Sequence, residues 1–170
     1  RIEREPTMLQ IHNSLTGRKE AFRPIVPGEV RMYVCGITVY DYCHLGHARM
    51  MIVFDVVQRW LRASGLRVTY ARNITDVEDK IIAAARDSGR SIEQVTDEFT
   101  AKYREDMAQL NALPPTLEPH ATHNIEPMIV LTEALIEKGH AYESMGHVLF
   151  SVESMAGYGA LSGRTLEDML

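Results

Sequence analysis

The chain has few of the features that mark a secreted or membrane protein. It contains only two cysteines in 170 residues, Cys35 and Cys43, too few for the disulfide framework of a small secreted domain. Its longest apolar run, residues 50–54, is far shorter than the roughly 20 residues that span a bilayer. Residues 1–7 are charged and lack the apolar core of a signal peptide. We therefore expect a cytoplasmic protein that contacts no membrane.

An excess of positive charge is also missing. The formal net charge is −5, which argues against a generally basic protein that coats nucleic acid but permits a local basic patch. No internal repeat and no low-complexity segment interrupts the sequence. The length suits one mid-sized domain or one part of a larger enzyme.

The order of apolar segments predicts an α/β fold. An apolar strand at residues 30–35 precedes a helix at 44–63, and a second strand follows at 66–71. A strand–helix–strand unit of this length gives two parallel strands of one sheet. The helix has apolar residues at helical spacing, which we expect to face the core: Ile52, Val53, Val56, Val57 and Trp60.

The rest of the chain predicts further helices and a hairpin. We expect a polar loop at residues 72–76, where ligand sites of open α/β sheets gather. Beyond it the pattern predicts two helices, the second of which is capped by Ser91, and a proline-rich break at 113–119. Other expected elements are a strand at 9–13, an edge segment at 22–26, a helix at 125–138 and a hairpin at 141–152.

Two parallel strands make an incomplete sheet. We therefore expect residues 8–113 to form the N-terminal half of a nucleotide-binding catalytic domain, with residues 114–170 as the start of a connective insertion. Residues 1–7 are expected to be an extension ahead of a plausible start at Met8.

The most informative stretch is CGITVYDYCHLGH at residues 35–47. His44 and His47 stand three apart at the start of a helix, so both rings should lie on one face. A helix N-terminus favours phosphate, and Gly46 has no Cβ to obstruct a flat ring such as adenine. With Cys35 at the end of the preceding strand, the stretch predicts a nucleotide site with a thiol at its edge.

These residues also have simpler interpretations. Cys35 and Cys43 can be packed thiols, and the two histidines can be helix caps. Together the four are zinc-type residues, but their spacing is not one of the common structural zinc patterns. A structural zinc module is therefore the less favoured hypothesis.

Several blocks resemble a known family. HLGH at 44–47 resembles the HIGH motif of class I aminoacyl-tRNA synthetases. YVCGITVYD at 33–41, RNITDVEDKI at 72–81 and EPHATH at 118–123 resemble the cysteinyl-tRNA synthetases in particular. The resemblance covers residues 8–170 and implies a Rossmann-like fold. Leu45 replaces the usual isoleucine, Glu78 stands where aspartate is common, and the family's Lys-Met-Ser-Lys-Ser-like loop is not in this chain.

The resemblance implies a reaction and a set of site residues. Cysteine and ATP, with Mg²⁺, would give cysteinyl-adenylate and pyrophosphate, and the cysteine would pass to tRNA(Cys). A monomer is expected, and this chain alone is expected to be inactive. The implied roles are catalysis by His44 and His47, ATP binding by these two and Gly46, substrate binding by Gly36, Thr38, Asn73 and Thr75, and zinc binding by Cys35.

The implied zinc ion has four ligands in the family, and the other three lie outside this chain. Ligation by a thiolate would separate cysteine from serine, because a hydroxyl is a poor ligand for a soft metal site.

Two other functions stay open at this point. A ligase of mycothiol biosynthesis, which joins activated cysteine to an amino-sugar, shares the CGIT and HLGH blocks. A non-catalytic module that binds a nucleotide or zinc is the third hypothesis. Lys80 could contact phosphate or tRNA or be a solvated charge, Asp41 could orient a neighbour or simply lead into the helix, and His120 and His123 are expected at the surface.

Overall fold

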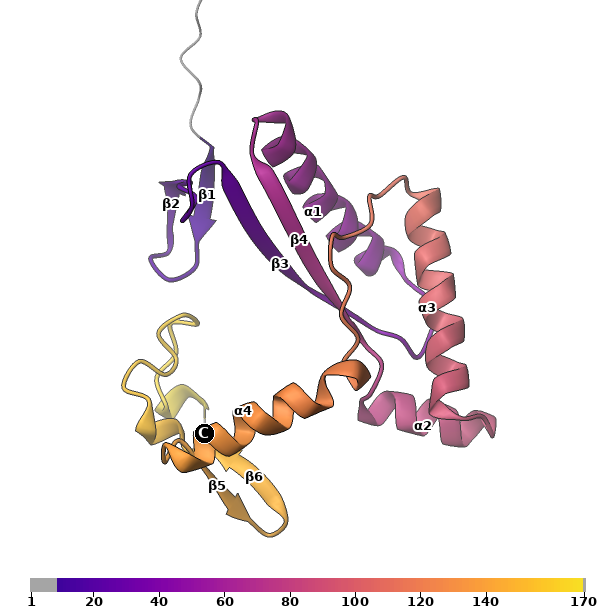
Figure 1. Ribbon diagram of the computed structural model, residues 1–170, viewed down its shortest axis with the longest axis vertical. Coiled ribbons are helices and arrows are strands. Elements are labelled where there is room, and N and C mark those ends of the chain that lie inside the picture. Colours follow the sequence, from indigo (N-terminus) through magenta and orange to yellow (C-terminus); the bar gives the residue numbers. More distant parts are fainter. Residues whose placement is uncertain (1–8, 170) are drawn as a thin grey trace, which may run out of the picture. The chain divides into compact units, whose positions relative to one another are not determined.

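The computed structural model describes residues 9–169, which belong to two compact units (Figure 1). One unit consists of residues 24–126, and the other combines residues 9–23 with residues 127–169. The extension expected at residues 1–7 lies outside the described residues. Among those described, no helix is both long and apolar enough to cross a membrane.

The unit of residues 24–126 is built on two parallel strands. Strand β3 (Glu29–Thr38) precedes helix α1 (Leu45–Ala63), and strand β4 (Arg67–Thr75) follows it. The strands pair in parallel from one end to the other, with a bulge in β3 between residues 34 and 37. Helix α1 packs against both strands. The predicted strand–helix–strand unit is therefore confirmed.

Strand β4 is longer than predicted, and the expected polar loop at residues 72–76 is wrong up to Thr75. Alternate side chains from Val68 to Ile74 are buried, as in any strand with one covered face. The pattern was hidden because one of these buried positions is Arg72. Residues 116–121 also lie parallel to β4 and bond to its backbone at two bridges.

The expected inward face of α1 is wrong. The buried side chains are Met51, Asp55, Gln58 and Leu61, whereas Ile52, Val53, Val56 and Trp60 are 41–60% exposed and Val57 is half-buried. Asp55 can be buried because its carboxylate accepts hydrogen bonds from the backbone of Leu113 and from the side chains of Gln58 and Arg59. Polar residues with local partners thus form part of the core face.

Helices α2 (Asp79–Ser88) and α3 (Ile92–Gln109) pack against each other. Gly89 ends α2 in the left-handed conformation, with φ of 65°. Ser91 begins α3 with the predicted capping box, since its hydroxyl accepts from the Gln94 amide. Both helix predictions are confirmed.

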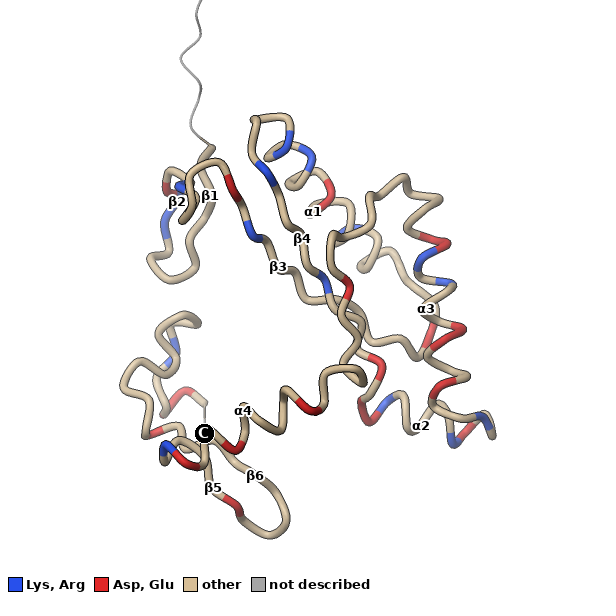
Figure 2. The backbone as a smooth tube through the Cα atoms, viewed as in Figure 1, with Lys and Arg blue, Asp and Glu red and all other residues tan. Residues whose placement is uncertain are grey.

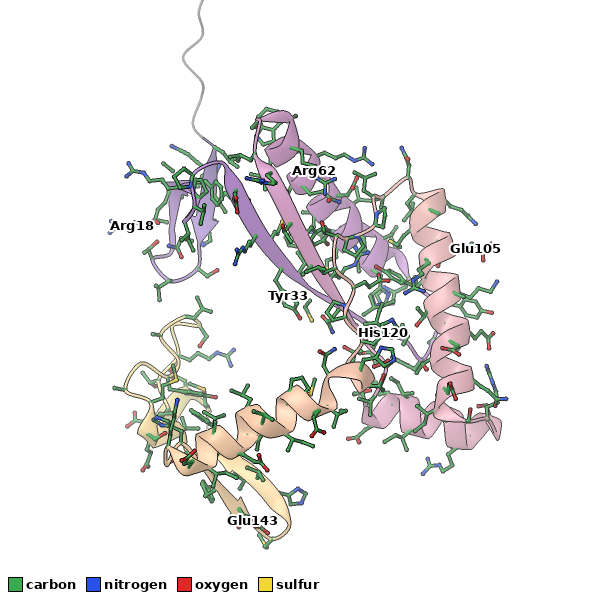
Figure 3. All side chains as sticks on the ribbon, in the orientation of Figure 1. Arg18, Tyr33, Arg62, Glu105, His120 and Glu143 are labelled. Atoms are coloured by element: carbon green, nitrogen blue, oxygen red, sulfur yellow. The ribbon has the colours of Figure 1, made fainter. Side chains whose placement is uncertain are left out.

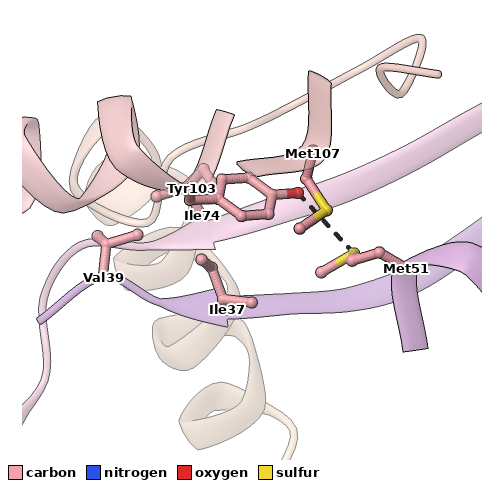
Figure 4. Packing of buried hydrophobic residues seen from close by; sticks show 6 residues of the cluster. All are labelled: Ile37, Val39, Met51, Ile74, Tyr103 and Met107. Carbon is pink, nitrogen blue, oxygen red and sulfur yellow. Dashed lines mark hydrogen bonds between the residues drawn. The ribbon is translucent and has the colours of Figure 1, made fainter. Parts of the chain in front are cut away.

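Helix α3 completes the main core of this unit (Figure 4). The Tyr103 hydroxyl points at the Met51 sulfur, 3.9 Å away. The cluster joins the carboxyl ends of both strands to α1 and α3, so it supports the edge of the sheet where a ligand site is expected. Its buried members are Ile37, Val39, Met51, Ile74, Tyr103 and Met107.

The other unit contains two hairpins. Strands β1 (Gln10–Asn13) and β2 (Arg18–Ala21) form one, and strands β5 (Ala141–Ser144) and β6 (His147–Phe150) form the other, after helix α4 (Ile125–Glu137). The edge segment expected at 22–26 is not a strand, because the partner of β1 lies at 18–21. A domain boundary at 113–114 stays a prediction; the compact unit runs to residue 126.

Candidate functional site

A cleft of about 360 Å³ opens at the carboxyl end of β3. The end of β3, its connection to α1, the first turn of α1 and the start of α2 all contribute to its wall. Four residues predicted for the site line it, namely Gly36, Thr38, His44 and His47. The other lining residues are Ile37, Tyr40, Asp41, Tyr42 and Lys80.

The two histidines form a stacked pair at the N-terminus of α1. Their ring centroids are 3.9 Å apart with 23° between the planes, so the prediction that they share one face is confirmed. The amide of Gly46 donates to Nδ1 of His44 (3.1 Å), and the amide of His44 donates to Nδ1 of His47 (3.2 Å). Each Nδ1 is therefore an acceptor, and each neutral ring carries its proton on Nε2.

The surroundings of His47 affect its charge. Burial lowers the pKa of His47, and the neighbouring His44 lowers it further. A neutral imidazole is thereby favoured at neutral pH. Because both Nδ1 atoms accept backbone hydrogen bonds, each ring offers the cleft an Nε2–H donor.

Gly46 is required by the fold of the pair itself. A Cβ on this residue would lie 2.9 Å from Cε1 of His44 and 3.0 Å from its Nδ1. The His44 ring can fold back to cap the helix only because that space is empty. Leu45 between them is 85% exposed, so leucine in place of isoleucine has no packing consequence in this unit.

Asn73 on β4 holds the bulge of β3 in place. Its Oδ1 accepts from the amide of Gly36 and from the hydroxyl of Tyr33, both at 2.8 Å, and its Nδ2 donates to Thr75 at 3.0 Å. A Cβ on Gly36 would lie 1.6 Å from the Asn73 carbonyl oxygen. Only glycine permits this approach. Figure 3 labels Tyr33 on β3.

Asn73 and Thr75 therefore lie behind the wall of the cleft and do not line it. Their role in substrate binding stays a prediction, and the observed contacts give Asn73 a supporting role. The sequence did not predict the Asn73–Gly36 contact, because this contact depends on the register of the two strands. It also did not predict that Tyr40 and Tyr42 line the cleft, because both belong to an irregular connection.

The two cysteines differ in their surroundings. Cys35 is exposed on the bulge, next to Gly36, while Cys43 is half-buried against the core cluster. Burial raises the pKa of the Cys43 thiol, and the charge of Asp106 raises it further. Cys43 is thus a packed thiol, as one of the sequence interpretations has it.

No group of three or more histidine, cysteine or acidic side chains suited to a metal ion occurs within residues 9–169. The exposed thiol of Cys35 has the donor chemistry of one soft ligand. Its role as a zinc ligand stays a prediction.

A second cavity, of about 480 Å³, lies between the end of β4 and α3. Asp76 in its wall is 6% exposed and accepts from the amide and hydroxyl of Thr122 and from Nδ1 of His120. Burial alone would raise the pKa of Asp76, but the bonds from Thr122 and His120 outweigh it and lower the pKa. His120, labelled in Figure 3, is therefore half-buried and bonded, whereas His123 is exposed as expected.

Comparison with known proteins shows which family this chain resembles. The profile of the family described as tRNA synthetases class I (C) catalytic domain matches residues 21–170. The cysteine–tRNA ligase of Methylobacillus flagellatus is 58% identical over 163 residues, which are 95% of this chain and 36% of that protein. That of Rhodospirillum rubrum is 58% identical over 162 residues, 95% of this chain and 35% of that protein.

A solved structure supports the same fold. Agrobacterium radiobacter LeuRS, in a ternary complex with tRNA and LeuAMS, matches 71% of this chain and 16% of its own with a TM-score of 0.57 at 23% identity. The expected Rossmann-like fold is thereby confirmed. The chain spans about a third of the length of the curated relatives it matches. Because the family profile covers most of the sequence and the expected histidine motif forms the expected helix start, the chain belongs to the class I (C) tRNA synthetase catalytic-domain family.

Proposed function

We propose that the protein containing this chain is a cysteine–tRNA ligase. The observation that supports this most directly is the pair of stacked histidines at the N-terminus of α1, beside an exposed cysteine on β3. The ligases that carry that name are 55–58% identical to this chain over 95% of its length. Such identity favours the tRNA enzyme over the amino-sugar ligase and over a non-catalytic module.

In the first half-reaction a carboxylate oxygen of cysteine attacks the α-phosphorus of ATP. The bond from that phosphorus to the bridging oxygen breaks, and its electron pair leaves with pyrophosphate. The enzyme has little covalent chemistry to perform, so position and charge stabilisation determine the rate. The Nε2–H groups of His44 and His47 can donate to phosphate oxygens as negative charge develops on them.

The stack restricts how the histidines act. Each ring is held by a backbone amide at Nδ1, so the donors at Nε2 are oriented before ATP arrives. Gly46 between them leaves room for the His44 ring, and in the proposal the adenine lies against this same turn. The arrangement is preorganised, which reduces the cost of ordering the site in the transition state.

Cysteine is proposed to bind beside β3. Gly36 and Thr38 line the cleft, and Asn73, which donates to Thr75, holds the bulge through the Gly36 amide. Cys35 would be one of four ligands of a zinc ion whose other three ligands lie outside this chain. A zinc ion bound there would act as a Lewis acid that coordinates the thiolate of cysteine in preference to the hydroxyl of serine.

In the second half-reaction the terminal ribose hydroxyl of tRNA(Cys) attacks the adenylate carbonyl and AMP leaves. We propose Mg²⁺ as the partner of ATP, a monomeric enzyme and a cytoplasmic location. Charges of both signs occur along α1, α2 and α3 (Figure 2). A uniform basic surface for the tRNA backbone is accordingly proposed to lie in the rest of the protein.

The test is cysteine charging of tRNA by the full-length protein, with serine as the rejected control. Cysteine-dependent exchange of pyrophosphate into ATP without charging would move the assignment to the amino-sugar ligase. His47→Ala should lower the exchange rate with the KM for cysteine retained. Cys35→Ser should remove bound zinc, which metal analysis measures independently of activity; unchanged zinc content would reject the ligand role.

A further inference from the structure

Lys80 lies in the cleft with the two histidines. It is the second residue of α2, and Glu78 caps that helix by accepting a hydrogen bond from the Lys80 amide at 2.9 Å. The Glu78 carboxylate is thus occupied by the backbone. The Lys80 ammonium lies instead over the ring of Tyr40, 5.7 Å from its centroid. Tyr40 also lines the cleft, so the aromatic face keeps the cation on that side.

Several other cations of this unit are paired with carboxylates. Arg59 bonds to Asp55, Arg104 bonds to Glu118 and Lys102 bonds to Glu105. Within residues 9–169, no carboxylate lies within 4.0 Å of the Lys80 nitrogen.

The charges that line the cleft are few. Asp41 provides one carboxylate, one of whose oxygens accepts from the Tyr42 amide at 2.8 Å. His44 and His47 provide Nε2–H donors on rings whose Nδ1 atoms are occupied. Lys80 is the one lining residue that carries a permanent positive charge. A triphosphate carries several negative charges, and the histidine donors alone do not neutralise them.

We infer that Lys80 binds the phosphate chain of ATP and stabilises the departing pyrophosphate. This inference rests on the proposed function and extends its site from α1 to the start of α2. The ammonium gains its strongest interaction when the bond from the α-phosphorus to the bridging oxygen breaks, because the electron pair then resides on pyrophosphate. Arginine can replace the charge, whereas a neutral side chain of similar length cannot.

The experiment compares Lys80→Met with Lys80→Arg and a control, Lys102→Met, in the full-length protein. Lys102 is an exposed lysine on α3, paired with Glu105 and absent from the cleft. Equilibrium binding of Mg²⁺–ATP is measured without cysteine, and cysteine-dependent pyrophosphate exchange is measured separately. Inorganic pyrophosphate serves as a competing probe in the binding assay.

Lys80→Met should weaken ATP binding and pyrophosphate competition by about tenfold, the value of one charge-assisted contact. It should raise the KM for ATP and lower the exchange rate, with the KM for cysteine changed by less than about twofold. Lys80→Arg should restore most of the loss, and Lys102→Met should match the unaltered protein.

Two outcomes would overturn the inference. Unchanged ATP binding and exchange in Lys80→Met would remove the residue from the phosphate site. If Lys80→Met kept pyrophosphate exchange but lost tRNA charging, the ammonium would be assigned to tRNA binding instead. Failure of the unaltered protein to exchange pyrophosphate at all would reject the proposed function, while the ATP-binding comparison would still decide the role of Lys80.

Discussion

The bulge that presents Cys35 depends on one amide side chain, and Asn73→Ala tests this dependence. The substitution removes the acceptor of the Gly36 amide and the donor to Thr75. The Tyr33 hydroxyl also loses its partner, but Tyr33 is 65% exposed, so water replaces that bond. The Gly36 amide is half-buried and cannot be resolvated as easily.

The magnitude follows from that difference. A lost neutral hydrogen bond that leaves a partly buried donor unpaired costs about 2 kcal/mol. At RT of about 0.59 kcal/mol, this corresponds to roughly a 30-fold increase in local opening of the bulge. Hydrogen exchange of the full-length protein, followed by mass spectrometry on peptides that cover residues 34–38, measures this increase directly.

Two companion variants separate the contributions. Tyr33→Phe removes only the phenol contact and should change exchange by no more than about twofold. Asn73→Asp keeps the acceptor for Gly36, so its amide should stay protected although the donor to Thr75 is lost. Equal acceleration in Asn73→Ala and Asn73→Asp, or none in either, would refute the argument that this acceptor holds the bulge.

Three further predictions concern the same unit. Gly36→Ala should displace β3 from β4, because its Cβ would meet the Asn73 carbonyl oxygen at 1.6 Å; loss of protection across both strands in hydrogen exchange checks this. The Asp76 pKa is lowered by Thr122, so its contribution to stability is present above the ordinary carboxyl pKa and is lost as pH falls through the lowered value. The difference in unfolding midpoint between the unaltered protein and Asp76→Asn should therefore be full at neutral pH and shrink as the pH falls below the ordinary carboxyl pKa of about 4, and a constant difference would contradict it. Met51→Ala should destabilise the core by about 2–5 kcal/mol, measured as a lower denaturation midpoint; a change below about 1 kcal/mol would show that Met51 does not join α1 to α3.

The sequence predicted helices and strands well where the spacing of apolar residues and the helix-capping residues indicated the same boundaries. Ser91 was expected to cap the second of the two helices that follow residues 72–76, and it is the N-cap of α3. The sequence failed where polar residues are buried. Arg72 is 4% exposed and lies beside the rings of Tyr70 and Tyr103, and the distant partner Tyr103 cannot be identified from local pattern.

The core face of helix α1 was also predicted wrongly. Its exposed apolar residues, Val53 and Trp60 among them, suggested the core face, while Asp55 and Gln58 occupy it. An apolar stripe indicates only that a surface is apolar, not which neighbour covers it. This chain spans about a third of its relatives' length. Apolar periodicity in α1 therefore does not distinguish the face that meets β3 and β4 from a face that other parts of a longer protein could cover.

The candidate site was easier to predict because its chemistry is local. His44 is the N-cap of α1 and His47 its third residue, and the reciprocal capping bonds bring the two rings together. The glycines were harder to interpret. From the sequence, Gly36 was expected to bind substrate and Gly46 to leave room for adenine. Each makes room for a group of the protein itself, a backbone carbonyl in one case and the His44 ring in the other. A glycine in a motif shows that something approaches closely, and only the structure identifies what does. Side chains at these two positions should therefore disturb the strand bulge and the histidine stack even without substrate.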